Sequence, residues 1–211
     1  METEKVNAIV LSCLEYGEYD IITSMFTLEH GLIRAFAKSA RRSVKRFGGT
    51  LEPLNCIEAT LLVRDNGLST LKSSELSACY PSIHCRLESM ALAMYGCELI
   101  EQLLPEGHPV PRLFRLFASF VDYLANNDAN TSVRRFFEIN LLNILGYRPE
   151  IPLPSLQTLK DCLRTGKFGS IIFNRQELRD AGKILDYSIE SHIQRPLKSV
   201  RFLDEMLERT P

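Results

Sequence analysis

The sequence lacks the motifs that usually mark an enzyme's active site. It has no GxSxG nucleophile elbow, no P-loop, no GxGxxG opening a helix, no HExxH and no aspartate-rich metal motif. Its four histidines lie far apart in the chain, and nothing pairs one of them with a cysteine nucleophile: His30, His84, His108 and His192. We therefore expect a protein that is not an enzyme and that needs no cofactor.

Long apolar runs are also absent. Polar residues interrupt every apolar stretch well before the roughly 20 positions that a membrane-spanning helix needs. The first ten residues, METEKVNAIV, are acidic before they are apolar, and they lack the order of a secretory signal. We expect the protein to stay in the cytoplasm, with no membrane partner.

Paired cysteine spacings are missing as well. The six cysteines contain no CxxC element: Cys13, Cys56, Cys79, Cys85, Cys97 and Cys162. In a cytoplasmic chain they are expected to be small buried side chains rather than a disulfide framework. The local cluster of Cys79, His84, Cys85 and Cys97 lacks the twice-repeated close spacing of structural zinc ligands. The sequence therefore predicts no metal site.

The first 80 residues have the pattern of β-strands. Apolar or alternating runs predict five strands, at 6–14, 21–27, 32–38, 51–64 (with a bend) and 68–73. Gly31 is expected to turn the second strand into the third with a positive φ, and Asn66-Gly67 to form a hairpin turn. Five short strands are too few for a sandwich and favour a small closed barrel of the OB type.

After Pro81 the pattern becomes helical. Apolar residues at helical spacing predict helices at 83–104, 113–124, 132–145, 156–163, 176–193 and 198–207, and Gly146 is expected to end the third. Residues 169–173 (GSIIF) could form a short strand or an extended link. The sequence therefore predicts an α+β protein, with an OB-fold barrel domain at 1–80 and a helical domain at 81–211.

A basic segment interrupts an otherwise balanced charge distribution. The formal net charge is -1, yet residues 34–46 carry six cations and no acid: Arg34, Lys38, Arg41, Arg42, Lys45 and Arg46. Because side chains alternate along a strand, Arg34, Phe36 and Lys38 should project from one face. Cations beside an aromatic ring can hold phosphates and stack a base. We predict that these seven residues bind DNA, whereas the alternative is a solvated loop.

Arg134 and Arg135 stand at an unfavourable position. They lie in the first turn of the helix predicted at 132–145, where the helix dipole disfavours cations. Arg134 also precedes Glu138, the weaker order for an ion pair four residues apart. The pair could bind an external anion, or it could pair with Asp128 or with an acid from another helix.

Several short elements together resemble the RecO family of recombination mediators, in the order of that family and nearly end to end. They are residues 17–23 (GEYDIIT), Phe26-Thr27, Glu29-x-Gly31, Ala37-Lys38-x-Ala40-Arg41, Leu51-Glu52-Pro53, Tyr95-x-x-Glu98-Leu99, Arg135-Phe136-x-Glu138 with Leu141-Leu142, Gly146-Tyr147-x-Pro149, and Leu197-Lys198-Ser199 with Leu203. No single element is as specific as a Walker motif, but their joint order is hard to obtain by chance.

The resemblance implies a DNA repair and recombination function without ATP. A protein of this family binds single- and double-stranded DNA, anneals complementary strands coated with single-strand binding protein, and helps RecR to load the recombinase, so it would be associated with the nucleoid. The basic barrel surface of the family corresponds to the segment from Arg34 to Arg46. The acidic C-terminal tail of single-strand binding protein would bind the helical domain at Arg134 and Arg135.

One departure from the family and one rival function are evident. Many RecO proteins carry a four-cysteine zinc module after the Gly-Tyr-x-Pro element, whereas residues 150–173 contain only Cys162. Metal binding is therefore not implied for this chain. The rival is an OB-fold protein that binds RNA or the ribosome, because OB surfaces bind both polymers.

Overall fold

The computed structural model describes residues 3–64, 67–152 and 156–208. The chain forms two compact units. The first contains Met1–Pro81 together with Cys97–Phe114, and the second contains Ser82–Gly96 together with Arg115–Pro211. A segment from the helical part of the chain thus belongs to the first unit. The predicted domain boundary near residue 80 stays a prediction.

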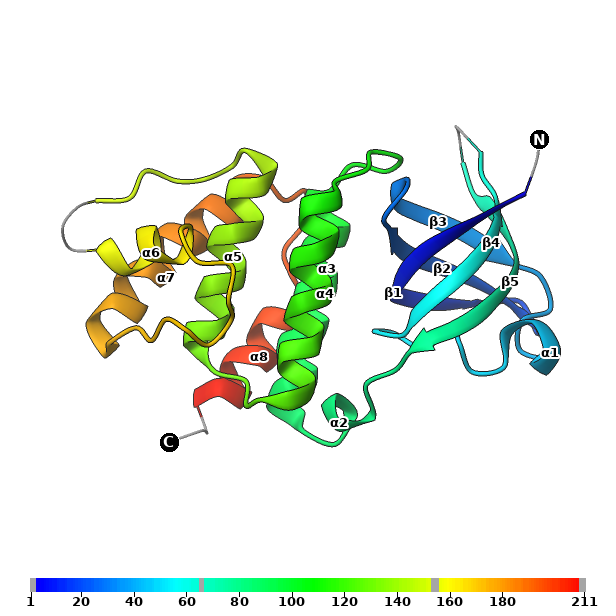
Figure 1. The fold of residues 1–211 in the computed structure, drawn as a ribbon, viewed down its shortest axis with the longest axis horizontal. Helices are drawn as coiled ribbons and strands as arrows, with labels where there is room; N and C mark the ends of the chain where they lie inside the picture. The colour runs from blue at the N-terminus through cyan, green and yellow to red at the C-terminus, as the bar shows by residue number, and fades with distance from the viewer. Residues whose placement is uncertain (1–2, 65–66, 153–155, 209–211) are drawn as a thin grey trace. The chain divides into compact units, whose positions relative to one another are not determined.

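The first unit is built on a closed barrel (Figure 1). Its strands are β1 (Glu4–Tyr16), β2 (Asp20–Thr27), β3 (Gly31–Ala37), β4 (Cys56–Leu62) and β5 (Ser69–Ala78). They follow the order β1-β2-β3-β5-β4, and the β3–β5 pair is parallel. Helices follow the barrel in the chain, so the predicted α+β class with an N-terminal barrel of the OB type is confirmed.

Alternation along the strands builds the barrel core. On β3, Ile33, Ala35 and Ala37 point inward and are buried, as their alternation predicts. β1 pairs with β4 through its first half and with β2 through its second half. Ala8 and Ile9 pair with both neighbours, and a bulge between Val10 and Ser12 follows them; such an extra residue bends a strand. This bend lets one long strand close the barrel.

The strand predicted at 51–64 is too long. Only Cys56–Leu62 forms β4, and the preceding residues form a turn in which Glu52 is exposed. Leu54 has a φ of 72°, a conformation that strands exclude, and its N–H donates to the carbonyl of Val10. The apolar residues Leu51 and Leu54 are buried although they are not in a strand, which explains why their pattern resembled one.

The segment Cys97–Phe114 packs on the outside of the barrel. The ring of Phe114 lies 5.4 Å from that of Phe26 on β2. Gly107 N–H donates to the carbonyl of Leu32 on β3 at 2.9 Å. Gly31 has the predicted positive φ, 69°, and a Cβ there would lie 2.0 Å from the carbonyl oxygen of His108. The turn between β2 and β3 therefore needs glycine for its backbone conformation and for this close contact.

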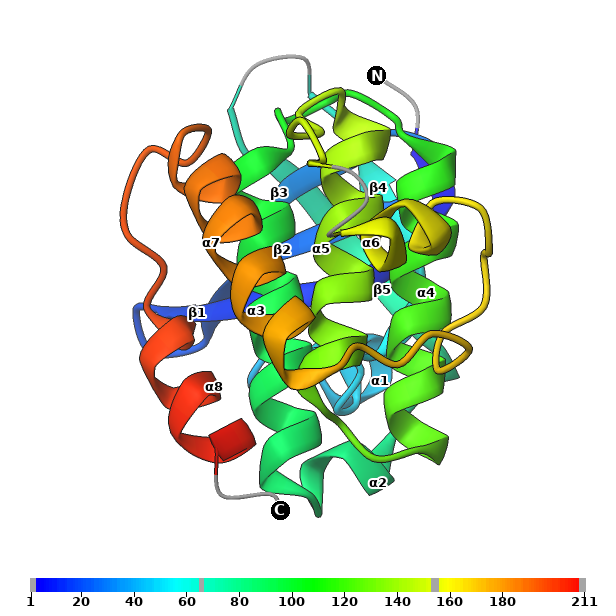
Figure 2. The ribbon, with the colours of Figure 1, turned by 90° about the vertical axis from the view of Figure 1, so that its left-hand side faces the viewer.

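The other regular elements of the described chain are helices (Figure 2). They are α1 (Val44–Phe47), α2 (Pro81–His84), α3 (Leu87–Leu103), α4 (Pro111–Asn126), α5 (Thr131–Leu145), α6 (Gln157–Cys162), α7 (Arg175–Glu190) and α8 (Ser199–Glu208). In the second unit, α5 contacts both α6 and α7. The predicted end of α5 is confirmed, since Gly146 takes the left-handed conformation. Among the described helices, none is long and apolar enough to cross a membrane.

Three other predictions meet different outcomes. The helix predicted at 83–104 is broken at Cys85-Arg86, where the Arg86 side chain donates to the carbonyl of Ala125 in the last turn of α4 and to that of Asn127 just after it. Residues 169–173 form no strand; Gly169 and Ser170 belong to a turn, in which Gly169 has a φ of 74°, and residues 171–173 are irregular. The predicted hairpin turn includes Asn66, which lies outside the described residues.

The burial predicted for the six cysteines is confirmed for two of them and wrong for the other four. Cys97 and Cys162 are buried, but Cys56 is intermediate and Cys13, Cys79 and Cys85 are exposed. Burial raises the pKa of Cys162 to about 12, so this thiol stays protonated and unreactive near neutral pH.

We expect Gly31→Ala to destabilise the protein by more than about 2 kcal/mol, because the new methyl group adds a clash with backbone to the strain of a positive φ. Gly17→Ala is the matched control. Gly17 has a similar φ, 61°, and nothing lies within 4 Å of its Cβ position. It should lose only about 1 kcal/mol. Urea unfolding of both variants measures the difference, and equal losses would show that the contact with His108 is not rigid.

Candidate nucleic-acid interface

The outward face of β3 presents a cation and an aromatic ring. Arg34 is exposed and Phe36 is partly exposed, while Ala35 between them points into the barrel. Lys38 follows the last residue of β3 and is exposed. The prediction that these three side chains alternate with core residues is confirmed. Their role in DNA binding stays a prediction.

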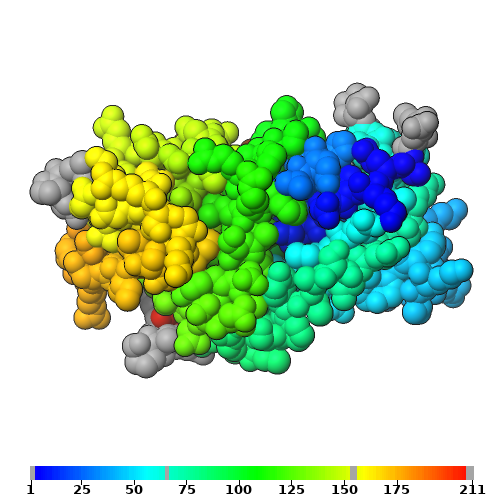
Figure 3. Space-filling view, viewed as in Figure 1, coloured from blue at the N-terminus to red at the C-terminus, as the bar shows by residue number. Residues whose placement is uncertain are grey.

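The second half of the basic segment is partly helical, although the sequence suggested only a loop. α1 begins after Ser43 and ends at Phe47, which is 3% exposed and belongs to the barrel core. Ala40 also packs in that core. These two apolar side chains hold the segment against the barrel, so Arg41, Arg42 and Lys45 remain exposed. Figure 3 shows this light-blue region at the surface of the first unit.

Two cations of the segment are already paired with carboxylates. Arg34 Nε lies 3.1 Å from Glu106, and Arg41 Nη1 lies 3.0 Å from Glu15. All four side chains are at least 43% exposed, so each pair contributes little to stability and exchanges readily. A phosphate could therefore compete for either arginine.

The other four cations have no carboxylate partner among the residues that the structure describes: Lys38, Arg42, Lys45 and Arg46. The guanidinium carbon of Arg42 lies 3.2 Å from the ring centroid of Tyr19. Arg46 donates to Ser43 Oγ at 2.9 Å and to the Lys38 carbonyl at 2.8 Å. These contacts orient the guanidinium groups without neutralising them, so the segment keeps a positive field.

The turn between β1 and β2 supports the basic segment, and sequence reasoning missed it. Arg41 N–H donates to the carbonyl of Tyr19 at 3.0 Å, and Ser39 N–H donates to the carboxylate of Asp20 at 2.6 Å. Tyr16, at the end of β1, makes an edge-to-face contact with Phe36. The alternation of residues within one strand could not predict that Tyr16 lies near Phe36. Their proximity depends on strand pairing, because β2 pairs with β1 on one side and with β3 on the other.

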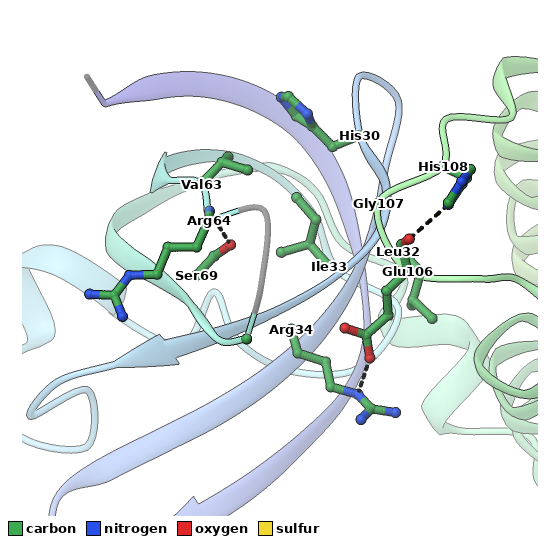
Figure 4. A pocket seen from close by; sticks show the side chains of 11 residues that line it. His30, Leu32, Ile33, Arg34, Val63, Arg64, Ser69, Glu106, Gly107 and His108 are labelled. Atoms are coloured by element: carbon green, nitrogen blue, oxygen red, sulfur yellow. Dashed lines mark hydrogen bonds and ion pairs between the residues drawn. The ribbon is translucent and has the colours of Figure 1, made fainter. Parts of the chain in front are cut away.

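A pocket of about 270 Å³ lies beside Arg34 in the first unit (Figure 4). Ile33 and Val63 line it, and Arg34 and Arg64 supply cationic side chains. The ion pair of Arg34 with Glu106 forms part of its wall. DNA that reached Arg34 here would meet the carboxylate of Glu106 as a competitor.

Arg134 and Arg135 lie in a different environment, within the second unit. They are 4% and 6% exposed. Arg134 Nε lies 2.8 Å from Glu138, and its Nη1 lies 2.6 Å from Asp204 on α8. Arg135 Nη1 lies 2.7 Å from both Glu138 and Asp186, the latter on α7. The network therefore joins α5 to α7 and α8.

Glu138 is the centre of this network. It is fully buried, and it accepts a hydrogen bond from the hydroxyl of Tyr95 on α3 at 2.5 Å. Burial by itself would raise the pKa of Glu138, but the guanidinium groups of Arg135 and Arg134 outweigh it and hold the pKa below its usual value. For Asp186 burial prevails, and its pKa is raised.

These contacts bear on the alternatives for the two arginines. Asp128, considered above as a partner, instead lies 3.5 Å from Arg86. Acids from other helices do pair with Arg134 and Arg135, so the network accounts for both charges without an external anion. It also explains the unfavourable order of Arg134 and Glu138, because burial strengthens a pair that would be weak on a surface. Binding of an acidic tail there stays a prediction.

No group of three or more His, Cys, Asp or Glu side chains is placed to hold a metal ion among the described residues. A closed barrel of the OB type with a basic outer segment defines the class: an OB-fold nucleic-acid-binding protein. Comparison with known proteins identifies it further. Residues 1–80 match the family domain described as "Recombination protein O N terminal", and residues 85–152 match "Recombination protein O C terminal".

Several known proteins are similar to this chain over nearly its whole length. The chain is 41% identical to the DNA repair protein RecO of Pelobacter propionicus over 98% of both chains. It is 38% identical to the proteins of the same name from Geobacter metallireducens and Geobacter sulfurreducens, over 98% of this chain and 99% of each relative. The chain belongs to the RecO family of DNA repair proteins, which act in recombination and bind DNA.

The alignment with the Pelobacter protein contains gaps in this chain. It spans 241 positions, whereas this chain has 211 residues, so at least 30 positions are gaps in this chain. The match to the C-terminal family domain ends at residue 152, just after the Gly-Tyr-x-Pro element.

We expect Glu138→Gln to lower the free energy of unfolding by about 3–5 kcal/mol at pH 7, because it leaves buried guanidinium groups without a full counter-charge. The pKa of Glu138 is lower in the folded protein than its usual value of 4.5. Its ionised form thus stabilises the fold above about pH 4.5, and this contribution is lost as the pH falls further.

Urea unfolding of wild type and variant at pH 7 and at pH 4 measures both effects, and the gap between them should narrow at the lower pH. Glu205→Gln is the control, since its exposed pair with Arg201 should contribute under about 0.5 kcal/mol. A gap that is constant with pH would contradict the ionised state of Glu138.

Proposed function

We propose that this protein is a recombination mediator that binds DNA through one surface of its barrel. This basic surface consists of Arg34, Phe36, Lys38, Arg41, Arg42, Lys45 and Arg46. The observation that carries the proposal is the anchoring of the segment by Phe47 and Ala40, which holds six cations at the surface of a barrel of the OB type. Proteins of this architecture bind oligonucleotides on the face of their second and third strands and on adjoining loops.

The basic surface gives the protein its affinity through phosphates. Neutralising phosphates releases condensed counterions, so binding does not depend on sequence and needs no nucleotide hydrolysis. Both single- and double-stranded DNA offer such phosphates. A cationic surface also lowers the repulsion between two complementary strands. We propose that the protein in this way anneals strands coated with single-strand binding protein, at the nucleoid in the cytoplasm and without a cofactor.

Two protein partners complete the proposal. RecR would act with this protein to load the recombinase onto coated single strands. The acidic C-terminal tail of single-strand binding protein would bind at Arg134 and Arg135. Asp204 and Asp186 are the half-exposed members of the network, at 49% and 45% side-chain exposure, so a tail carboxylate would have to compete with them.

Reversing the charges of Arg41 and Arg42 to Glu should weaken binding of single-stranded DNA and flatten its salt dependence. Six phosphate contacts give a log–log slope of about -4, and losing two of them should reduce its magnitude by about 1.4. Annealing of oligonucleotides coated with single-strand binding protein should slow in parallel. Fluorescence anisotropy at several salt concentrations measures the slope.

The control is the double variant Arg179→Glu with Lys183→Glu, which makes the same change of net charge on an exposed part of α7 in the second unit. It should bind and anneal as wild type does. If the barrel variant kept the affinity and slope of wild type, the basic surface would not be the DNA site.

Arg134→Ala should weaken binding of a labelled tail peptide by ten- to a hundredfold, the loss of one charge-assisted contact of about 1.5–3 kcal/mol. Asp204→Asn should have the opposite effect, because it removes a competing carboxylate from Arg134. DNA binding by the barrel should persist in both variants. Unchanged peptide affinity with a lower melting temperature in Arg134→Ala would leave this arginine a purely structural role.

A further inference from the structure

The outer face of β1, β2 and β3 carries side chains in rows that cross the three strands. The first row consists of Ile9, Phe26 and Leu32, which the strand register places opposite one another. All three are at most 2% exposed. The segment Cys97–Phe114 covers this row, and Phe114 contacts Phe26. The apolar side chains of this first row are thus buried by another segment of the same chain.

The second row is polar and only partly covered. It consists of Ser12, Ser24 and Arg34. Ser12 donates a hydrogen bond to Glu101 at 2.6 Å, and Arg34 pairs with Glu106. Both acids belong to the same covering segment. These polar contacts therefore lie at the edge of the area that the segment Cys97–Phe114 covers.

The third row is apolar, and the protein leaves it open. It consists of Leu14, Ile22 and Phe36, again opposite one another in the register. Leu14 is 64% exposed, and the side chains of Ile22 and Phe36 are only partly buried. Tyr16, which is 56% exposed, extends the row, and its ring lies 6.1 Å from that of Phe36 at an angle of 84°. These four residues are called the open row.

Cations flank the open row. Arg34 lies one row before it on β3, and Lys38 lies just beyond the end of that strand. Arg41 is held next to the end of β1 by its contact with Glu15. An apolar strip with two aromatic rings between cations is complementary to a chain that alternates flat bases with phosphates. It suits a duplex poorly, because a duplex keeps its base faces stacked inside.

We propose that the open row is a stacking site for unpaired bases, with Tyr16 and Phe36 as the stacking rings. It gives the barrel a preference for single strands that the cations alone do not provide. This inference rests on the proposed binding of DNA by the basic surface. Phosphate contacts then determine affinity for any DNA, and the open row determines which form is preferred.

The test compares Tyr16→Leu, which removes the ring but stays apolar, with Tyr16→Phe, which keeps it. Tyr16→Leu should lower the affinity for an oligothymidine about tenfold, the effect of one lost stacking contact. Its affinity for a blunt duplex and the salt slope should be those of wild type. Tyr16→Phe should bind both as wild type does, and Phe36→Leu should repeat the selective loss.

A second readout follows from the composition. The chain has no tryptophan and seven tyrosines, so tyrosine emission is directly visible. Oligothymidine should quench less of this emission in Tyr16→Phe than in wild type, although both bind equally well. Equal quenching would place Tyr16 away from the bases and overturn the stacking role.

Outcomes for the open row and for the basic surface are separable. If the Arg41→Glu, Arg42→Glu variant loses both polymers while Tyr16→Leu loses neither, the stacking site is overturned and the proposed function stands. If Tyr16→Leu lowers the affinity for duplex and for single-stranded DNA equally, the proposed preference of the open row for single strands is overturned. A change in sedimentation of Tyr16→Leu with unchanged DNA binding would instead assign the open row to contacts between copies of the chain.

Discussion

Closure of the barrel is the constraint on which the outer surface of the first unit depends. Once β1 pairs with both β2 and β4, every second side chain of each strand must point inward. On β3 the core is then filled by Ile33, Ala35 and Ala37. The alternating side chains of Arg34 and Phe36 must therefore face outward. The position of the cations is therefore a consequence of packing, not of their own contacts.

Only part of the outer face of the barrel is covered by another segment of the chain. The segment Cys97–Phe114 buries the first apolar row under Phe114, and its acids Glu101 and Glu106 meet the polar row beside it. Beyond this edge the apolar side chains stay exposed, next to the cations. An exposed apolar strip rimmed by charge commonly marks a binding surface. The same segment thus covers one part of the barrel face and delimits the part that stays exposed.

The second unit uses its charges differently. Arg134 and Arg135 resemble surface arginines in sequence, yet they are buried around Glu138 and tie α5 to α7 and α8. Buried ion pairs often contribute specificity of arrangement more than net stability. Here they join α5 to α7 and α8 at defined side chains. The unfavourable sequence order of these charges was a signal of burial as much as of binding.

The sequence by itself determined the barrel, the helical character of the later part and the position of the basic segment. Strand alternation and helical spacing of apolar residues are local properties, so they can be read without knowing the tertiary contacts. Its ordered motifs also indicated the family. Only the tertiary structure decided that residues 51–54 form a turn with Leu51 and Leu54 buried, that Phe47 anchors a basic helix, and that Tyr16 lies against Phe36. It also decided which acids neutralise Arg34, Arg41, Arg134 and Arg135. Those contacts join residues far apart in the chain, and no local pattern encodes which distant side chains the fold will bring together.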